Sequence, residues 1–307
     1  MHWALGELLD DFFIPKVESD HELSIRVYPR GAICSESTCV EQVLLDELDV
    51  ATISAGNIGA FGSTFDVLNL PYLFKDQAAA TEVLNDWLKD ELAESARQEM
   101  GIRVLAITPG GGFRNIVNTQ RPVELPQDLE GLKMRTTKSP IELGLISAWG
   151  ASVVPYDWAL LYEGLQAGVV QGMYLQDVFM GVAGLASVVN YITRTEATYS
   201  AHILLMSEAR FQRLSPKQQN LLLEAGRNVE RMAEQYYDAW IKAGIASLED
   251  KLHITALSPD QRSKWESQAL SAWVQFDGLY SQERVKRILE YQQRYQFIED
   301  LRKVGAL

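Results

Sequence analysis

The chain has 307 residues but only two cysteines and four histidines, and it lacks the common signatures of metal and nucleotide sites. The histidines are scattered along the sequence, so their spacing predicts no metal site, and we expect neither metal nor cofactor. No HExxH, GxSxG, Walker or GxGxxG motif is present. These absences argue against a zinc protease, an α/β-hydrolase and a nucleotide-binding enzyme.

Long hydrophobic runs are missing as well. No stretch approaches the roughly 18 consecutive apolar residues that a membrane-spanning helix requires, so we expect no direct membrane insertion. The opening residues, MHWALGELLDDFF, show neither the basic region nor the apolar region of a signal peptide. Because export signals are removed from mature proteins, their absence here does not indicate a cytoplasmic location.

Basic residues are scarce relative to acidic ones. The 28 lysines and arginines face 41 aspartates and glutamates, which gives a net charge of −13. Nucleic acid phosphates and anionic membrane surfaces would repel such a chain. The charge therefore argues against nucleic acid partners and otherwise indicates only solubility.

The two cysteines, Cys34 and Cys39, lie five residues apart in GAICSESTCVEQV. Without a CxxC pattern or nearby histidines they form a poor zinc site. They are either two unpaired thiols or a disulfide around the start of a helix. Export from the cytoplasm would favour the disulfide.

Helix-like and strand-like segments alternate in the first third of the chain with short connections. This alternation predicts an α/β fold. The predicted helices cover residues 4–13, 39–48 and 76–100, and the predicted strands cover residues 23–29, 49–54 and 102–108.

A long amphipathic helix is predicted after Ser215, which is a good N-cap and can form a capping box with Gln218. The apolar stripe continues to about residue 250, which corresponds to a helix of roughly 50 Å. A helix of that length would cross two lobes, unless it breaks near Gly226 or Gly244.

Two arginines are candidate ligand-binding residues. Arg114 follows the glycine-rich segment TPGGGFRN, and Arg135 ends GLKMR, at the end of a predicted strand and before a predicted helix at Pro140. Guanidinium groups bind carboxylates through two parallel hydrogen bonds and remain charged at physiological pH. Both could equally be surface residues paired with acidic side chains. The glycines fit either an anion-binding loop or a tight turn, and Trp158 fits either a core position or a ligand-contacting wall.

Over most of its length the sequence resembles the periplasmic solute-binding proteins of tripartite ATP-independent periplasmic (TRAP) transporters. The resemblance rests on RVYPRGAICSE, LDVATIS, VLNLPYLFKD, GFRNIVNTQRPVELPQDLEGLKMRT and WGASVVPYDWALLYEGLQAGVVQG. The combination of GLKMR with the YEGLQAGVVQG block is specific, although each piece alone is common.

The resemblance implies a bilobal α/β fold that closes on a ligand, with a hinge and a long helix spanning both lobes. The first lobe would comprise residues 1–112 and about 201–240, and the second residues 113–200 and about 241–307 with the spanning C-terminal helices. The protein would be periplasmic, with its signal peptide outside this chain, and would deliver its ligand to a membrane permease. The resemblance also leads us to expect that the family's first strand is absent from this chain and that His2 and Trp3 lie near the cleft mouth.

The same resemblance places the binding residues. Arg135 would form the main salt bridge to the ligand carboxylate, Arg114 would line the same cleft, and Trp158 would pack on the ligand. The remaining candidate ligand-binding residues are Ser54, Asn57, Tyr72, Phe74, Tyr174, Leu175 and Asp177.

This sequence departs from its relatives at three pocket positions. Leu160, Gln171 and Leu175 stand where relatives commonly carry a glutamate, an acidic residue and a carboxylate-binding asparagine. We therefore expect a less polar pocket and a monocarboxylate ligand with an apolar or aromatic body. Two other functions remain open, a ligand sensor of the same fold and an α/β enzyme acting on a small acid.

Overall fold

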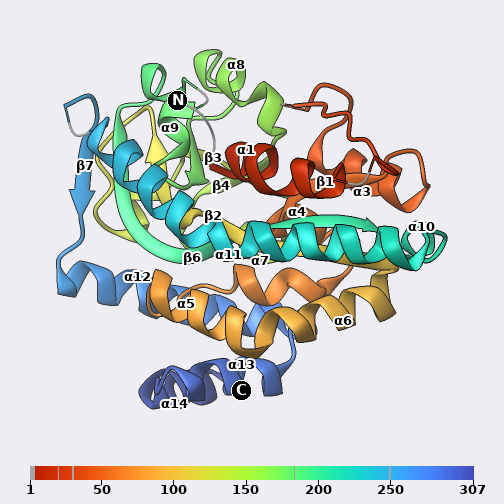
Figure 1. The fold of residues 1–307 in the computed structure, drawn as a ribbon. Helices are drawn as coiled ribbons and strands as arrows, with labels where there is room; N and C mark the ends of the chain where they lie inside the picture. The colour runs from red at the N-terminus through yellow and green to blue at the C-terminus, as the bar shows by residue number, and fades with distance from the viewer. Residues whose placement is uncertain (1–3, 20, 30, 183, 249) are drawn as a thin grey trace.

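The computed structural model describes residues 4–19, 21–29, 31–182, 184–248 and 250–307 (Figure 1). His2 and Trp3, for which a place near the cleft mouth is expected, lie outside the described residues. The strands are β1 (Val50–Ser54), β2 (Ile102–Asn118), β3 (Lys133–Thr136), β4 (Ser152–Pro155), β5 (Gly172–Leu175), β6 (Tyr191–Ser207) and β7 (His253–Ala256).

Helices surround the strands and connect them. Short π-helical turns join α1 to α2 and α5 to α6, so the predicted helices 4–13 and 76–100 are both present. The α-helices are α1 (Ala4–Leu8), α2 (Ile14–Val17), α3 (Glu36–Leu44), α4 (Ala55–Ile58), α5 (Gln77–Val83), α6 (Lys89–Met100), α7 (Pro140–Ala148), α8 (Leu161–Gln166), α9 (Phe179–Val182), α10 (Glu208–Gln212), α11 (Pro216–Ala246), α12 (Pro259–Trp273), α13 (Gln282–Tyr291) and α14 (Tyr295–Val304).

A seven-stranded mixed sheet forms the centre of the molecule, with strand order β1-β6-β2-β5-β3-β4 and with β7 paired to β6. The antiparallel strands β2 and β6 are each 17 residues long. β1 pairs with the C-terminal half of β6, where Ser54 lies opposite His202. β7 pairs with the other end of β6, where His253 lies opposite Tyr191. Two long strands thus connect the two halves of the sheet.

The glycine-rich segment after the predicted strand 102–108 is neither a loop nor a tight turn, because β2 continues through it. The pairing of β2 with β6 shifts register between Pro109 and Phe113, which marks a β-bulge. Gly111 and Gly112 have φ values of 96° and 93°, a region that side chains disfavour and glycine adopts freely. The glycines therefore bend a long strand at the junction of the two halves.

The prediction of a strand at residues 23–29 is wrong. No strand of the described sheet pairs with this segment, and the backbone N–H of Ile25 donates instead to Glu18 Oε1 at 2.7 Å. Val27 and Tyr28 are 54% and 41% exposed. The apolar, β-branched composition favours an extended chain, but a strand also requires a neighbour with free backbone groups.

The long helix is confirmed as α11, which has 31 residues and no break at Gly226. Its capping box forms as predicted, because Ser215 Oγ accepts from the Gln218 backbone N–H at 3.3 Å and Gln218 Oε1 accepts from the Ser215 N–H at 3.0 Å. A Cβ atom on Gly226 would lie 1.8 Å from the Leu105 carbonyl oxygen. Glycine at this position therefore lets α11 pack closely on β2.

Two hydrophobic cores cover the two faces of the sheet. Along β5, Tyr174 belongs to one core and its neighbours Met173 and Leu175 to the other, as the alternation of side chains along a strand requires. Helices α5, α6, α7 and α12 to α14 pack in the first core, and α1, α2, α8, α9 and α11 pack in the second (Figure 1).

Asp66 is a buried acid between Phe65 and Val67, which belong to the first of these cores, the one that contains Tyr174. It is 1% exposed, and its carboxylate packs so closely on Gly59 that a Cβ atom there would lie 2.5 Å from Oδ1. Burial raises the pKa of Asp66 to about 7, and the neighbouring Asn69 offsets only part of that effect. Between pH 4 and 7 the folded state therefore holds a proton that the unfolded state has lost.

Replacing this acid should stabilise the protein at neutral pH. Because the folded-state pKa is raised, the free energy of unfolding falls as pH rises from about 4 to 7, by at most about 4 kcal/mol. We expect Asp66→Asn to be more stable than the unchanged protein at pH 8 but not at pH 4.5, as measured by urea unfolding. The exposed Asp86→Asn serves as the control. An equal effect of Asp66→Asn at both pH values would contradict the assignment.

Candidate functional site

Arg135 lies near the C-terminal end of β3, between the parallel neighbours β4 and β5. Its side chain is 3% exposed, and Nε donates to the Tyr156 carbonyl oxygen at 2.9 Å. Within the described residues Arg135 makes no ion pair, and its two terminal nitrogens make no hydrogen bond. Buried charges are normally paired. The terminal N–H groups of this buried cation are therefore still available to an anion.

In Arg114, on β2, all three guanidinium nitrogens in contrast lie close to oxygen atoms of the protein. Its Nε lies 2.9 Å from Glu142 Oε1 in α7, Nη1 donates to the Tyr174 carbonyl oxygen at 3.2 Å, and Nη2 donates to Ser54 Oγ at 3.3 Å. Arg114 and Glu142 are both almost completely buried. This buried ion pair fixes Arg114, so we assign it the role of shaping the site beside Arg135.

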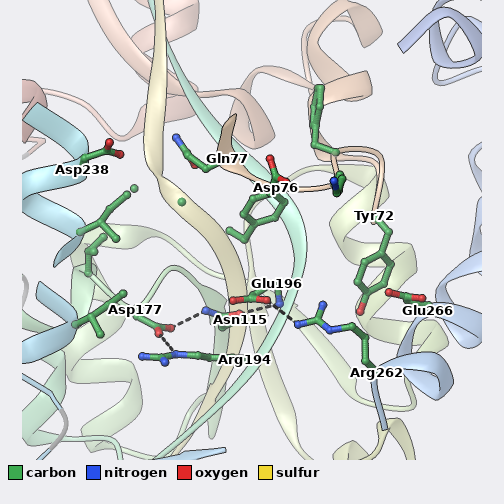
Figure 2. Close-up of a pocket in the computed structure, with 18 of the residues that line it drawn as sticks. Tyr72, Asp76, Gln77, Asn115, Asp177, Arg194, Glu196, Asp238, Arg262 and Glu266 are labelled. Carbon is green, nitrogen blue, oxygen red and sulfur yellow. Dashed lines mark hydrogen bonds and ion pairs between the residues drawn. The ribbon is translucent and has the colours of Figure 1, made fainter. Parts of the chain in front are cut away.

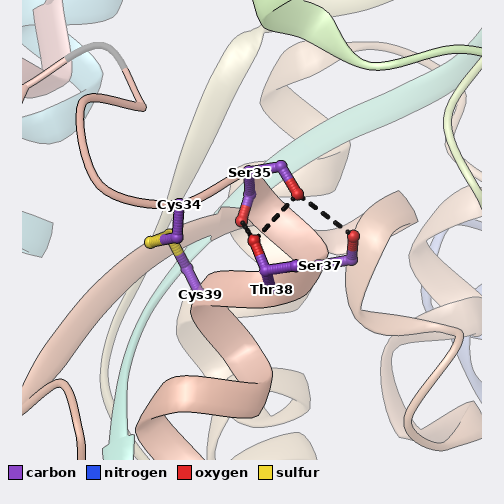
Figure 3. Close-up of a disulfide and its surroundings, with 5 residues drawn as sticks. All are labelled: Cys34, Ser35, Ser37, Thr38 and Cys39. Atoms are coloured by element: carbon purple, nitrogen blue, oxygen red, sulfur yellow. Dashed lines mark hydrogen bonds between the residues drawn. A yellow bond between two sulfur atoms is a disulfide. The ribbon is translucent and has the colours of Figure 1, made fainter.

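Glu36, in the first turn of α3, completes the cluster and was not predicted. Its Oε1 accepts the Ser54 backbone N–H at 2.7 Å, and its Oε2 accepts a short hydrogen bond from Asn57. A disulfide between Cys34 and Cys39, with Cα atoms 5.3 Å apart, brackets this turn (Figure 3). The structure thus brings Arg135, Arg114, Ser54 and Asn57 together around Glu36. A lone glutamate after a turn is no distinctive sequence signal, so Glu36 could not be predicted.

The charges of the cluster leave it attractive to an anion. Burial, followed by the nearby Arg114, lowers the pKa of Arg135 to about 10, so it remains protonated at neutral pH. Burial raises the pKa of Glu36, and the Ser54 N–H and Arg135 offset part of that effect. Burial and Arg114 also lower the pKa of His202 to about 3, so that imidazole is neutral. Since Glu142 pairs with Arg114 and Glu36 is hydrogen-bonded to Ser54 and Asn57, the terminal nitrogens of Arg135 are the donors left for a ligand carboxylate.

An aromatic row leads to this cluster. The half-buried Trp158 lies with its ring centroid 5.5 Å from that of Phe179, which lies 6.5 Å from His202. His202 is in turn the strand partner of Ser54. Trp158 is therefore placed where it can form an apolar wall of the site, and Phe179 is a second aromatic that the sequence did not indicate.

Tyr174 does not present its side chain to the arginine cluster, whereas Leu175 lies on the same face of the sheet as Phe179. The Tyr174 ring packs on Trp149, and its hydroxyl donates to Thr198 at 2.7 Å, so only its carbonyl oxygen meets Arg114. Leu175 is buried in the core on the opposite face of the sheet from Tyr174, and this core also contains Phe179 and contacts Trp158. The divergent positions are also outside the cluster, since Leu160 is 54% exposed and Gln171 accepts the Lys133 backbone N–H.

Tyr72, Phe74 and Asp177 form a separate group that lines a cavity of about 620 Å³ (Figure 2). The residues that line this cavity do not include Arg135, Arg114, Ser54 or Asn57. Arg114 points to Ser54, whereas the next residue, Asn115, points to Asp177 and donates to its Oδ1 at 2.7 Å. Of the ten candidate residues, three thus line this cavity and two, Tyr174 and Leu175, are buried in the cores. The other five lie in the arginine cluster or beside it.

Neither a metal cluster nor a membrane-spanning helix is found in the described part of the chain. No group of three or more histidine, cysteine, aspartate or glutamate side chains there could hold a metal ion. None of the described helices is long and apolar enough to cross a bilayer.

Comparison with known proteins places the chain among binding proteins. The family of bacterial extracellular solute-binding proteins, family 7, matches residues 15–278. The 2,3-diketo-L-gulonate-binding periplasmic protein of Escherichia coli is 26% identical over 237 residues, which cover 75% of this chain and 72% of the relative.

Solved structures of similar proteins share the fold. A sugar acid binding protein of Advenella mimigardefordensis in complex with galactonate is 19% identical, with a TM-score of 0.87 over 95% of this chain and 93% of that one. A TRAP periplasmic solute-binding protein of Sulfurospirillum deleyianum with bound succinate is 19% identical, with a TM-score of 0.86 over 93% and 94%.

These similarities confirm the predicted bilobal binding-protein fold and the prediction that the protein is not an enzyme. The family is extracytoplasmic, in keeping with the disulfide. The chain belongs to the bacterial extracellular solute-binding proteins of family 7, the solute-binding components of TRAP transporters.

Proposed function

We propose that this protein captures a small organic acid through a salt bridge between the ligand carboxylate and Arg135. The observation that carries the proposal is the buried guanidinium of Arg135, whose terminal nitrogens have no partner within the described residues. A carboxylate could accept hydrogen bonds from two of these N–H groups at once. The galactonate and succinate bound by similar structures support an acid as the ligand class.

The ligand we propose is a monocarboxylate with an apolar or aromatic body. Trp158 and Phe179 form an aromatic row beside the cluster, and such surfaces favour apolar ligand groups at about 25 cal/mol per Å² buried. Since the Tyr174 side chain faces the other core, this proposal depends on Trp158, Phe179 and Leu175, which share one core.

Ligand capture would proceed by closure of two lobes about the bulge in β2 and the facing part of β6. We propose lobe boundaries at residues 1–112 with about 201–240, and 113–200 with about 241–307. Lys138 joins these lobes, because its backbone N–H donates to Asn57 Oδ1 at 3.1 Å and its Nζ to Ser37 Oγ at 2.8 Å. A ligand must favour the closed form by roughly 5 kcal/mol to shift a mostly open protein to a mostly closed one.

Delivery would follow in the periplasm, after export and removal of a signal peptide, by docking of the closed form on the membrane subunits of a TRAP permease. The family supports this partner and this location.

A thermal-shift screen of the purified protein against organic acids, amines and neutral metabolites tests the proposal. We expect one or a few monocarboxylates with aromatic or branched bodies to raise the melting temperature strongly, since ligand that binds only the folded state stabilises it. Stabilisation by small dicarboxylates alone would contradict the proposed ligand body. Stabilisation by neutral or cationic compounds alone would contradict the role of Arg135.

A further inference from the structure

The cavity of about 620 Å³ is separate from the Arg135 cluster and lies against the glycine bulge of β2. Gly111, Gly112 and Phe113 form one wall, and residues of β6, α11 and α12 form the others. Figure 2 shows its polar floor, where Asp177, Asn115 and Arg194 meet.

The floor contains an unfilled hydrogen-bond donor. Asp177 is 5% exposed and accepts from Asn115 Nδ2 at 2.7 Å and from Arg194 Nε at 3.0 Å. The Nη2 atom of Arg194 is buried and has no hydrogen-bond partner among the described residues. Nη2 itself is sealed from the cavity, but the Arg194 side chain is 27% exposed, and its Nη1 atom makes no hydrogen bond within the described residues. Nη1 is therefore the donor that a ligand oxygen can reach.

Unfilled acceptors line the same cavity. Glu266 and Asp238 make no hydrogen bond and no ion pair within the described residues, whereas Glu196 is already paired with Arg262 at 2.6 Å. Five carboxylates and four basic side chains line the cavity in total. A simple anion would therefore enter a region of net negative charge, and a ligand that also carries a positive group would fit better.

The backbone around the cavity is held in unfavourable conformations. Tyr72 and Glu196 have φ values of 57° and 46°, which residues other than glycine rarely adopt. The N–H of Tyr72 donates to the Ala197 carbonyl at 2.6 Å, and the N–H of Glu196 donates to Asn115 Oδ1 at 2.9 Å. Such outliers cluster at ligand sites more than elsewhere, which supports a binding role here.

We propose that this cavity is a second ligand site, which binds a small zwitterion of the amino acid class. The ligand carboxylate would accept from Arg194 Nη1, and the ligand ammonium group would be attracted by Glu266 and Asp238. Phe74, Phe113 and Ile241 supply the apolar walls for the carbon chain. This site does not depend on the acid-binding role of Arg135, because neither Arg135 nor Arg114 lines the cavity.

Titrations with ω-amino acids test the site. The titrations use the Arg135→Ala variant, so that ligand binding at the Arg135 cluster does not contribute to the signal. Calorimetry compares 4-aminobutanoate, 5-aminopentanoate and 6-aminohexanoate with the fatty acids and alkylamines of the same chain length. We expect at least one amino acid to bind, and its matched acid and amine to bind at least about tenfold more weakly, as expected from the loss of one charge-assisted hydrogen bond.

Variants then locate the binding. Arg194→Gln, which can still donate to Asp177, and Glu266→Gln should each weaken amino acid binding about tenfold or more. The exposed Arg231→Gln is the matched control and should leave it unchanged. The proposal would be overturned if no amino acid binds, or if the matched fatty acid binds with the same affinity as the amino acid. It would also be overturned if neither Arg194→Gln nor Glu266→Gln changes the affinity for the amino acid. None of these outcomes bears on the thermal-shift screen of the unchanged protein, so the two proposals can fail separately.

Discussion

Arg135→Ala is expected to weaken binding of the organic acid about 100-fold or more, which corresponds to at least about 2.7 kcal/mol. The loss should be large because Arg135 is buried and its terminal nitrogens are not used by the described protein. For the same reason the ligand-free protein should lose little stability, since removing a buried charge without a counter-ion can be neutral or favourable.

Calorimetric titration with the best acid from the thermal-shift screen measures this effect. Arg135→Lys distinguishes charge from geometry, since lysine retains the charge but not the planar pair of N–H groups. We expect it to bind with intermediate affinity. Arg231→Ala, which removes an exposed arginine, should change nothing. Unchanged affinity in Arg135→Ala would show that the carboxylate is held elsewhere.

The elements with strong local signals were predictable from the sequence. The capping box at Ser215 and the apolar stripe behind it gave α11, and the α/β alternation gave the fold class. The prediction of a strand at residues 23–29 was wrong because strand formation depends on a neighbouring strand, about which a local sequence pattern holds no information. The prediction of a loop or tight turn at the glycines after residue 108 was wrong for a related reason, since glycine permits a loop and a bulged strand equally well.

The candidate site was only partly predictable, because sequence proximity does not tell which side of a strand a residue faces. Arg114 and Asn115 are neighbours, yet they point to different sites. Tyr174 likewise meets the cluster only through its backbone. Glu36 was missed because it joins the cluster through contacts 18 and 21 residues away, to Ser54 and Asn57.

The ion pair between Arg114 and Glu142 should make the second large contribution, in this case to stability. Glu142→Gln retains the shape of the side chain but leaves Arg114 without its counter-ion at 2.9 Å. Breaking a buried pair on one side costs about 3–5 kcal/mol. We expect urea unfolding to show a loss of that size, whereas the exposed Glu47→Gln should have no measurable effect.

A double-mutant cycle separates the pair from its surroundings. Arg114→Met combined with Glu142→Leu should cost less than the two single changes added together, with a coupling energy of about 1–3 kcal/mol. Additive losses would mean that Arg114 is held chiefly by Ser54 and by the Tyr174 carbonyl. The cycle also bears on the binding site, because Arg114 lowers the pKa of Arg135 by repulsion. If Arg114 and Glu142 are strongly coupled, the charge of Arg114 is already neutralised by Glu142. Arg135 is then the cation whose charge the ligand carboxylate compensates.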